Sequence, residues 1–160
     1  MTFIGGLVGA SFMDITESYL SKLGINSGVN GTYIAKWVHG LARGQFYHSN
    51  IDNTPALDHE FIIAALFHYI IGGGAVALGY AVLISLQYAP LMAWHIPLSI
   101  AFGLMTCMLP WFILMPAIGK GVLGTKMAMG AKPVLAPILS HIAYGLGIGI
   151  TLFIYDVLTA

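Results

Sequence analysis

The stretch 61-FIIAALFHYIIGGGAVALGYAVLISL-86 decides the fold class of this chain. It contains no Lys, Arg, Asp or Glu, and it is longer than the roughly 20 apolar residues that an α-helix needs to cross a bilayer core of about 30 Å. Leu, Ile, Val and Ala occur throughout it rather than on one face, which is typical of a helix surrounded by lipid and other helices. The stretch therefore predicts a transmembrane helix.

Three further segments have a similar length and apolar character, at about 3–23, 95–114 and 134–158. The whole chain of 160 residues is 58% hydrophobic and only 8% charged, too little polar surface for a water-soluble domain of this size. We therefore predict an all-α integral membrane protein, one domain over 1–160, built as a four-helix transmembrane bundle with the lipid bilayer as its main partner. The segment 61–86 corresponds to the second helix.

The first segment carries the weakest signal, because Asp14 and Glu17 interrupt its apolar residues. It lacks the positively charged start of a secretory signal, so we expect a retained helix. The six Lys and Arg balance six Asp and Glu, and nucleic acid is not an expected partner. Cys107 is the only cysteine, which excludes an internal disulfide and a zinc site built on several thiolates.

The connection at about 24–60 contains most of the polar side chains. Within it, Thr32–Leu41 has apolar residues at helical spacing with Lys36 on the opposing face, which predicts either a short interfacial helix with Trp37 at headgroup level or an ordinary packed loop helix. All cations lie in or beside the first and third connections: Lys22, Lys36, Arg43, Lys120, Lys126 and Lys132. The positive-inside rule then places these connections in the cytoplasm and both termini on the outer side.

Small residues recur at intervals that allow helices to pack closely. Gly5 and Gly9, the run 72–74, and Gly145, Gly147 and Gly149 are spaced in this way. We expect helix packing from them, and a homo-oligomer or larger membrane complex could use the same faces. Pro110 and Pro116 are expected to bend and end the third helix, and a kink there would open a cavity between helices.

Ionisable side chains within apolar segments are the candidates for chemistry, because burying them in a bilayer is costly. They are Asp14, Glu17, His68 and His141. Counted from the predicted cytoplasmic helix ends at about 1.5 Å per residue, Asp14, His68 and His141 all lie roughly 10–14 Å deep. Three helices thus offer polar groups at one level near the cytoplasmic face.

Several interpretations of these polar groups at a common depth remain open. Asp14, His68 and His141, with His48 from the connection, are the ligand types that zinc, iron or manganese prefer, and Glu60 is then the candidate catalytic general base. Alternatively, His68 and His141 could bind haem b as axial ligands. Asp14 could also pair with one histidine simply to fix helix packing, or these groups could belong to a proton or ion pathway.

Ordered short motifs extend over nearly the whole chain: Met13-Asp14, Arg43-Gly44-Gln45-Phe46-Tyr47-His48, Pro55, Glu60, His68-Tyr69, Gly72, Pro110, Pro116-x-x-Gly119-x-Gly121 and Ser140-His141-x-x-Tyr144-Gly145. In these the chain resembles an uncharacterised family of small bacterial inner-membrane proteins with four predicted helices, a domain of unknown function. The resemblance implies a multi-pass protein of the bacterial inner (cytoplasmic) membrane. The chain departs from the family pattern at Gln45, where Arg is usual, and at Met115, where Gln often precedes the proline.

The polar candidates differ in how they fit this resemblance. Asp14, His48, Glu60, His68 and His141 fall on its motifs, whereas Glu17 does not, and Glu17 is therefore ranked lower. Three function classes follow: a membrane-embedded binding site for a metal or haem, with or without catalysis; a non-catalytic subunit of a larger complex; and a small transporter. The sequence does not decide among them.

Overall fold

The computed structural model describes residues 1–86 and 94–160, and the regular elements in that part are all helical. In chain order they are α1 (Thr2–Lys22), α2 (Gly31–Leu41), η1 (Ile51–Asn53), α3 (Glu60–Leu66), η2 (Phe67–Ala75), α4 (Val76–Ser85), α5 (His95–Thr106), η4 (Pro110–Leu114), α6 (Met115–Ala117), η5 (Val122–Gly124) and α7 (Lys132–Thr159). The all-α prediction is confirmed for these residues. The predicted connection between the second and third helices lies partly outside them.

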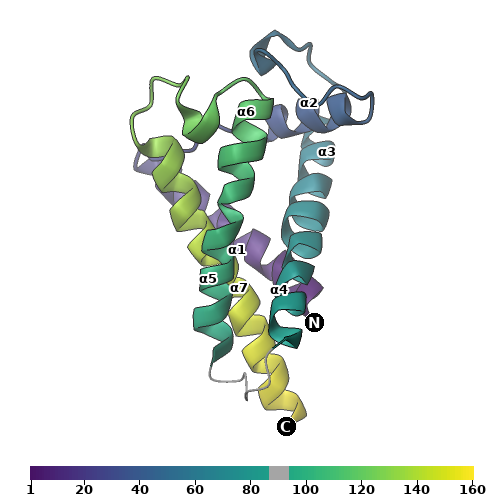
Figure 1. The fold of residues 1–160 in the computed structure, drawn as a ribbon, viewed down its shortest axis with the longest axis vertical. Coiled ribbons are helices and arrows are strands. Elements are labelled where there is room, and N and C mark those ends of the chain that lie inside the picture. Colours follow the sequence, from purple (N-terminus) through teal and green to yellow (C-terminus); the bar gives the residue numbers. More distant parts are fainter. Residues whose placement is uncertain (87–93) are drawn as a thin grey trace.

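Three helices are long and apolar enough to cross a membrane within the described ranges. One runs without interruption through α3, η2 and α4 (Glu60–Ser85), one through α5, η4 and α6 (His95–Ala117), and the third is α7. In Figure 1 these three lie along the long axis of the molecule. The helix α1, predicted as a fourth span, is present but is not among the three, since it carries Asp14, Glu17 and Lys22 in its second half.

The helix α1 crosses behind the other helices and packs against α7 and η2 (Figure 1). Glycines bring these backbones together: a Cβ on Gly6 would collide with the carbonyl oxygen of Gly73, and a Cβ on Gly147 would lie 2.6 Å from Gly9 Cα. Gly145 contacts α5 instead, where a Cβ would overlap the carbonyl oxygen of Ser99. The glycines spaced along α7 thus serve two different helix contacts within the chain, as small residues do in membrane bundles.

Two of the long helices contain π-helical segments, η2 and η4, where the backbone is wider than in an α-helix. The segment η4 begins at Pro110, which has no N–H to donate and whose ring clashes with the carbonyl four residues earlier. The segment η2 contains the run Gly72 to Gly74, which tolerates backbone conformations outside the α-helical norm. A π-helical segment thus begins at Pro110, where a bend was expected, and the helix continues past Pro116 to Ala117.

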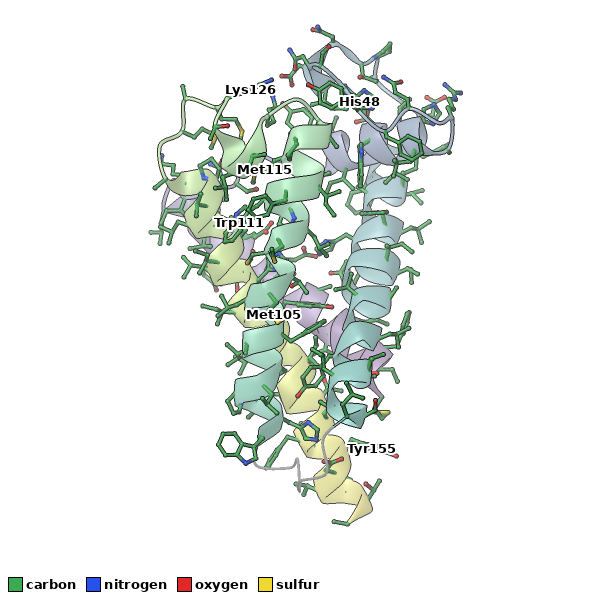
Figure 2. The ribbon with its side chains drawn as sticks, in the orientation of Figure 1. His48, Met105, Trp111, Met115, Lys126 and Tyr155 are labelled. Carbon is green, nitrogen blue, oxygen red and sulfur yellow. The ribbon has the colours of Figure 1, made fainter. Side chains whose placement is uncertain are left out.

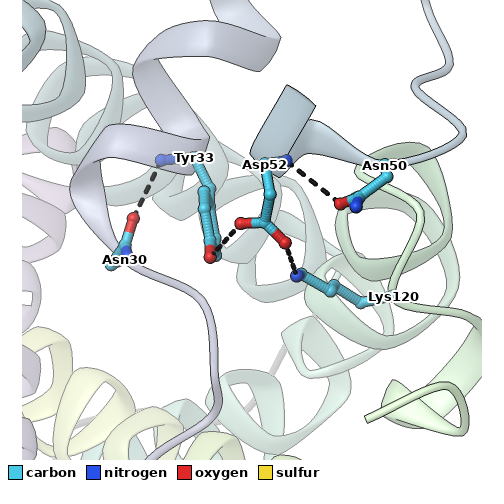
Figure 3. A network of polar contacts seen from close by, with 5 residues as sticks. All are labelled: Asn30, Tyr33, Asn50, Asp52 and Lys120. Atoms are coloured by element: carbon cyan, nitrogen blue, oxygen red, sulfur yellow. Dashed lines mark hydrogen bonds and ion pairs between the residues drawn. The ribbon is translucent and has the colours of Figure 1, made fainter. Parts of the chain in front are cut away.

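The first connection folds over one end of the bundle, with α2 lying across that end (Figure 1). The side chain of Asn30 caps α2 by accepting the Tyr33 N–H at 2.9 Å, and Tyr33 Oη donates to Asp52 Oδ1 at 2.5 Å (Figure 3). Lys120 Nζ, from beyond α6, lies 2.7 Å from Asp52 Oδ2. This network joins the first connection to the third.

Lys36 was expected on the exposed face of α2, and that expectation is wrong. Its side chain is 8% exposed, and Nζ donates to the Thr54 carbonyl oxygen at 2.7 Å. The connection after α2 folds back over the helix and covers the lysine stem, an arrangement that the helical periodicity alone does not reveal. Trp37 also faces inward: its ring packs edge-on against Phe67 at 5.7 Å, and Nε1 donates to the Phe46 carbonyl oxygen at 3.2 Å.

Candidate functional site

A cavity of about 380 Å³ lies between the helices, toward the end covered by α2. Its walls come from α1, the η2 helix, the end of α5 with η4, and α7, while Ile34 and Trp37 of α2 contribute from the connection. The volume lies within the range of small-molecule sites, and most of the lining is apolar, as in sites that bind lipophilic ligands. A few polar side chains interrupt it: Glu17, Ser27, His68, Thr106, Ser140 and His141.

Both π-helical segments face this cavity. Phe67, His68, Ile71 and Gly72 of η2 line one side, and residues of η4 line another. A Cβ on Gly72 would meet nothing closer than 3.8 Å, in contrast to the tightly packed Gly73 beside it. π-Helical turns are frequent at functional sites because they redirect side chains away from regular helix packing.

His141 is the more buried of the two histidines at the cavity, with 9% of its surface exposed. Its Nδ1 lies 2.8 Å from Thr106 Oγ1 and 3.3 Å from the Gly103 carbonyl oxygen. This approach depends on Gly103, where a Cβ would overlap the carbonyl oxygen of His141. Close contact between α5 and α7 therefore fixes the imidazole ring, and Nε2 has no hydrogen bond to another described residue.

His68 and Asp14 form a pair beside the cavity. His68 Nε2 lies 3.1 Å from Asp14 Oδ1, although the ring N–H is not well aligned with the carboxylate, and Tyr69 Oη donates to Asp14 Oδ2 at 2.6 Å. Asp14 is 48% exposed and is not part of the cavity lining. The structure thus brings Asp14 and His68 together, as the packing interpretation expected, and places His68 and His141 on one cavity.

The remaining candidates are distributed differently. Glu17, ranked lowest from the sequence, borders the cavity. His48 lies in the first connection (Figure 2), buried against Gly40, with Gln45 Nε2 and Thr54 Oγ1 each 3.3 Å from its Nδ1. Glu60 begins α3, where Oε1 accepts the Leu57 N–H at 2.9 Å. Neither His48 nor the proposed general base Glu60 lines the cavity.

The metal and haem hypotheses find no supporting geometry in the residues that the structure describes. Within 1–86 and 94–160, no three His, Cys, Asp or Glu side chains are grouped so that they could hold a metal ion. For haem b, both imidazoles must present a free nitrogen to one iron, but His68 Nε2 faces the Asp14 carboxylate. Zinc, iron, manganese and haem therefore remain sequence-based hypotheses.

The sequence does not indicate one further polar contact. His95 is 4% exposed, and its Nε2 lies 2.8 Å from Asp156 Oδ2 near the C-terminal end of α7. Tyr80 Oη donates to the His95 carbonyl oxygen at 3.3 Å. Because the two residues are 61 positions apart, no local pattern indicates the pair. It fastens α5 to α7 at the end of the molecule opposite the cavity.

The fold and cavity define the class: a helical protein with three membrane-length helices and a mostly apolar cavity between them. The chain belongs to the family described as "Protein of unknown function (DUF2938)", which matches residues 3–155. The expected membership of an uncharacterised family is thus confirmed over nearly the whole chain. Comparisons with curated proteins and with solved structures find no match.

Proposed function

We propose that this chain is an integral protein of the bacterial inner membrane whose interhelical cavity binds a lipid-soluble small molecule. The observation that carries the proposal is the cavity itself, apolar for most of its lining and bordered by two π-helical segments. Its two opposite walls belong to helices that are long and apolar enough to be surrounded by lipid. A ligand that enters between them arrives from the bilayer, and this favours a lipophilic molecule.

The proposal includes a fourth membrane crossing by α1. This helix has 21 residues, about 32 Å at 1.5 Å per residue, so it is long enough for the bilayer core. Its N-terminal half packs backbone to backbone against α7 and η2 through Gly5, Gly6 and Gly9. The polar half that carries Asp14 and Glu17 lies toward the cavity end, where His68 and Tyr69 contact Asp14.

The orientation rests on the distribution of charge. Every Lys and Arg belongs to the segments 22–43 or 120–132, and both segments lie at the end of the molecule that α2 covers (Figure 1). Under the positive-inside rule this end faces the cytoplasm. The cavity then opens near the cytoplasmic leaflet, and both termini lie toward the outer side.

The test uses Trp37, which lines the cavity, as a fluorescent reporter. In a Trp94→Phe, Trp111→Phe background in detergent, bromodecane should quench Trp37 in a saturable manner, because bromine quenches indole only at short range. Gly72→Leu should abolish the saturable part, since Gly72 lines the cavity and a Cβ there meets nothing closer than 3.8 Å. Gly79→Leu, on the exposed surface of α4, is the matched control for quenching from the micelle.

Equal quenching in the Gly72→Leu and Gly79→Leu proteins would show that the probe reaches Trp37 only from the micelle. The binding function would then be wrong. Circular dichroism of all three proteins checks that the helices are intact.

A further inference from the structure

The tautomer of His141 can be deduced from its neighbours. Thr106 Oγ1 donates its single hydrogen to the Gly103 carbonyl oxygen at 2.6 Å, so towards His141 it can act only as an acceptor. The Gly103 carbonyl oxygen, 3.3 Å from Nδ1, is also only an acceptor. Two acceptors at Nδ1 require that this nitrogen carries the proton.

A neutral imidazole protonated at Nδ1 has a lone pair at Nε2. Because His141 lines the cavity and is about nine-tenths buried, this lone pair is an acceptor set in a mostly apolar environment. An acceptor left unmatched there costs free energy, so a ligand that supplies a donor gains affinity over one that cannot. The same logic makes sites with buried polar groups reject ligands that lack the matching group.

We infer that the cavity selects lipid-soluble hydroxyl compounds, long-chain alcohols or phenols, by accepting their O–H at His141 Nε2. The inference rests on the proposed function and names its ligand class. An O–H donor matches the acceptor at His141 Nε2, whereas an ammonium group would need a paired charge, and the carboxylate that borders the cavity is Glu17. The Asp14 carboxylate lies outside the lining and is engaged by His68 and Tyr69. Thr106 is then a positioning residue, which acts through the ring of His141.

Three probes of equal chain length test the inference in the single-Trp37 protein: ω-bromodecanol, its methyl ether and ω-bromodecylammonium. We expect the alcohol to bind about tenfold more tightly than the ether, the value of roughly one net hydrogen bond. Thr106→Val should narrow the difference between the two affinities, and Thr106→Ser, which keeps the hydroxyl, should preserve the preference. His141→Phe should also remove it.

A second readout does not depend on binding. Nitrogen-15 NMR of the His141 ring should show a proton on Nδ1 and none on Nε2 in the wild-type protein, and a weaker preference in Thr106→Val, where the Gly103 carbonyl oxygen is the acceptor that remains at Nδ1. A proton on Nε2 in the wild type would overturn the inference.

The binding outcomes separate the two proposals. Equal affinity of alcohol and ether in the wild type contradicts donor selection but leaves the binding function standing. Tighter binding of the ammonium probe than of the alcohol also contradicts it, and would indicate that the Glu17 carboxylate recognises a cation. If no probe gives saturable quenching, the binding function itself fails.

Discussion

Tyr144 joins α7 to η2, the π-helical segment of the long helix Glu60–Ser85. It is 1% exposed, and its Oη donates to the Gly73 carbonyl oxygen at 2.6 Å. A π-helical turn disturbs the regular backbone hydrogen bonds, so a side-chain donor at this point helps to satisfy its carbonyls. The contact therefore stabilises both the helix pair and one wall of the cavity.

Tyr144→Phe should lower the free energy of unfolding by about 1 kcal/mol, because it removes this buried donor and little volume. The measurement is reversible unfolding in detergent, followed by circular dichroism. Tyr155→Phe, at an exposed position on the same helix, is the control and should change stability little. Equal losses in the two variants would show that the Tyr144 hydrogen bond contributes nothing specific.

Individual polar residues were predictable in part. The cost of burial in a bilayer singled out Asp14, His68 and His141 as candidates. In the structure His68 and His141 line one cavity, and Asp14 contacts His68 from outside the lining. The partner of His141 is Thr106, whose short side chain gives no signal in an apolar segment. Glu17 was ranked below Asp14 because it does not fall on a motif of the family resemblance. The rotation of α1 about its own axis decides instead which of the two carboxylates borders the cavity.

At the scale of elements, the first connection is held to the third by the Asp52 network. Hydrogen bonds from Lys120 and then Tyr33 lower the pKa of Asp52 from its ordinary 3.8, and the neighbouring carboxylate raises the pKa of Tyr33 above 10.0. Asp52 thus favours the docked state above its ordinary pKa and loses this effect as the pH falls through the lowered value. Tyr33 favours docking below its ordinary pKa and loses the effect as the pH rises through the raised one.

Lys120→Gln should loosen this docking and make the exposed chain around Arg43 more mobile, so that trypsin cleaves it more readily. At neutral pH we expect trypsin to cleave the variant at this point faster than the wild type. Hydrogen exchange in α2 is the second measurement: below about pH 4 the wild type should exchange nearly as fast as the variant, because Asp52 becomes protonated. Lys126→Gln removes an exposed lysine from the same connection and serves as the control. Indistinguishable cleavage of all three proteins would mean that other contacts hold the connection.

The approximate boundaries of the long helices could be predicted from composition, because each apolar segment is about as long as the helix that it forms. The helix α2 was also predictable from the apolar spacing over Thr32–Leu41. That spacing left open whether the helix lies at a membrane interface or packs as an ordinary loop helix. The π-helical segments were not: Pro110 indicated a bend and the run from Gly72 indicated close packing, but neither pattern specifies a wider helix. Tertiary contacts, such as the one from Tyr144, decide that geometry.

For the whole molecule, the charge distribution predicts the topology. A reporter that is active only in the cytoplasm should work when inserted at Gly44 or Gly130, two exposed glycines whose surroundings are open, and should fail after Ala160. Activity after Ala160 would invert the topology and place the cavity near the outer leaflet. Activity on both sides would contradict a single orientation.

The length of α7 has a consequence for the choice of membrane. Its 28 residues extend about 42 Å, while the helix from His95 to Ala117 has 23 residues and extends about 35 Å. In the proposed transmembrane arrangement, a helix of this length must tilt in, or protrude from, a hydrocarbon core of about 30 Å. In Figure 2, Tyr155 lies near the end of α7 that extends beyond its neighbours. Since α7 is bound closely to both α1 and α5, bilayer thickness acts on its tilt and through it on the wall that carries His141. We therefore expect ligand affinity to vary with lipid acyl-chain length.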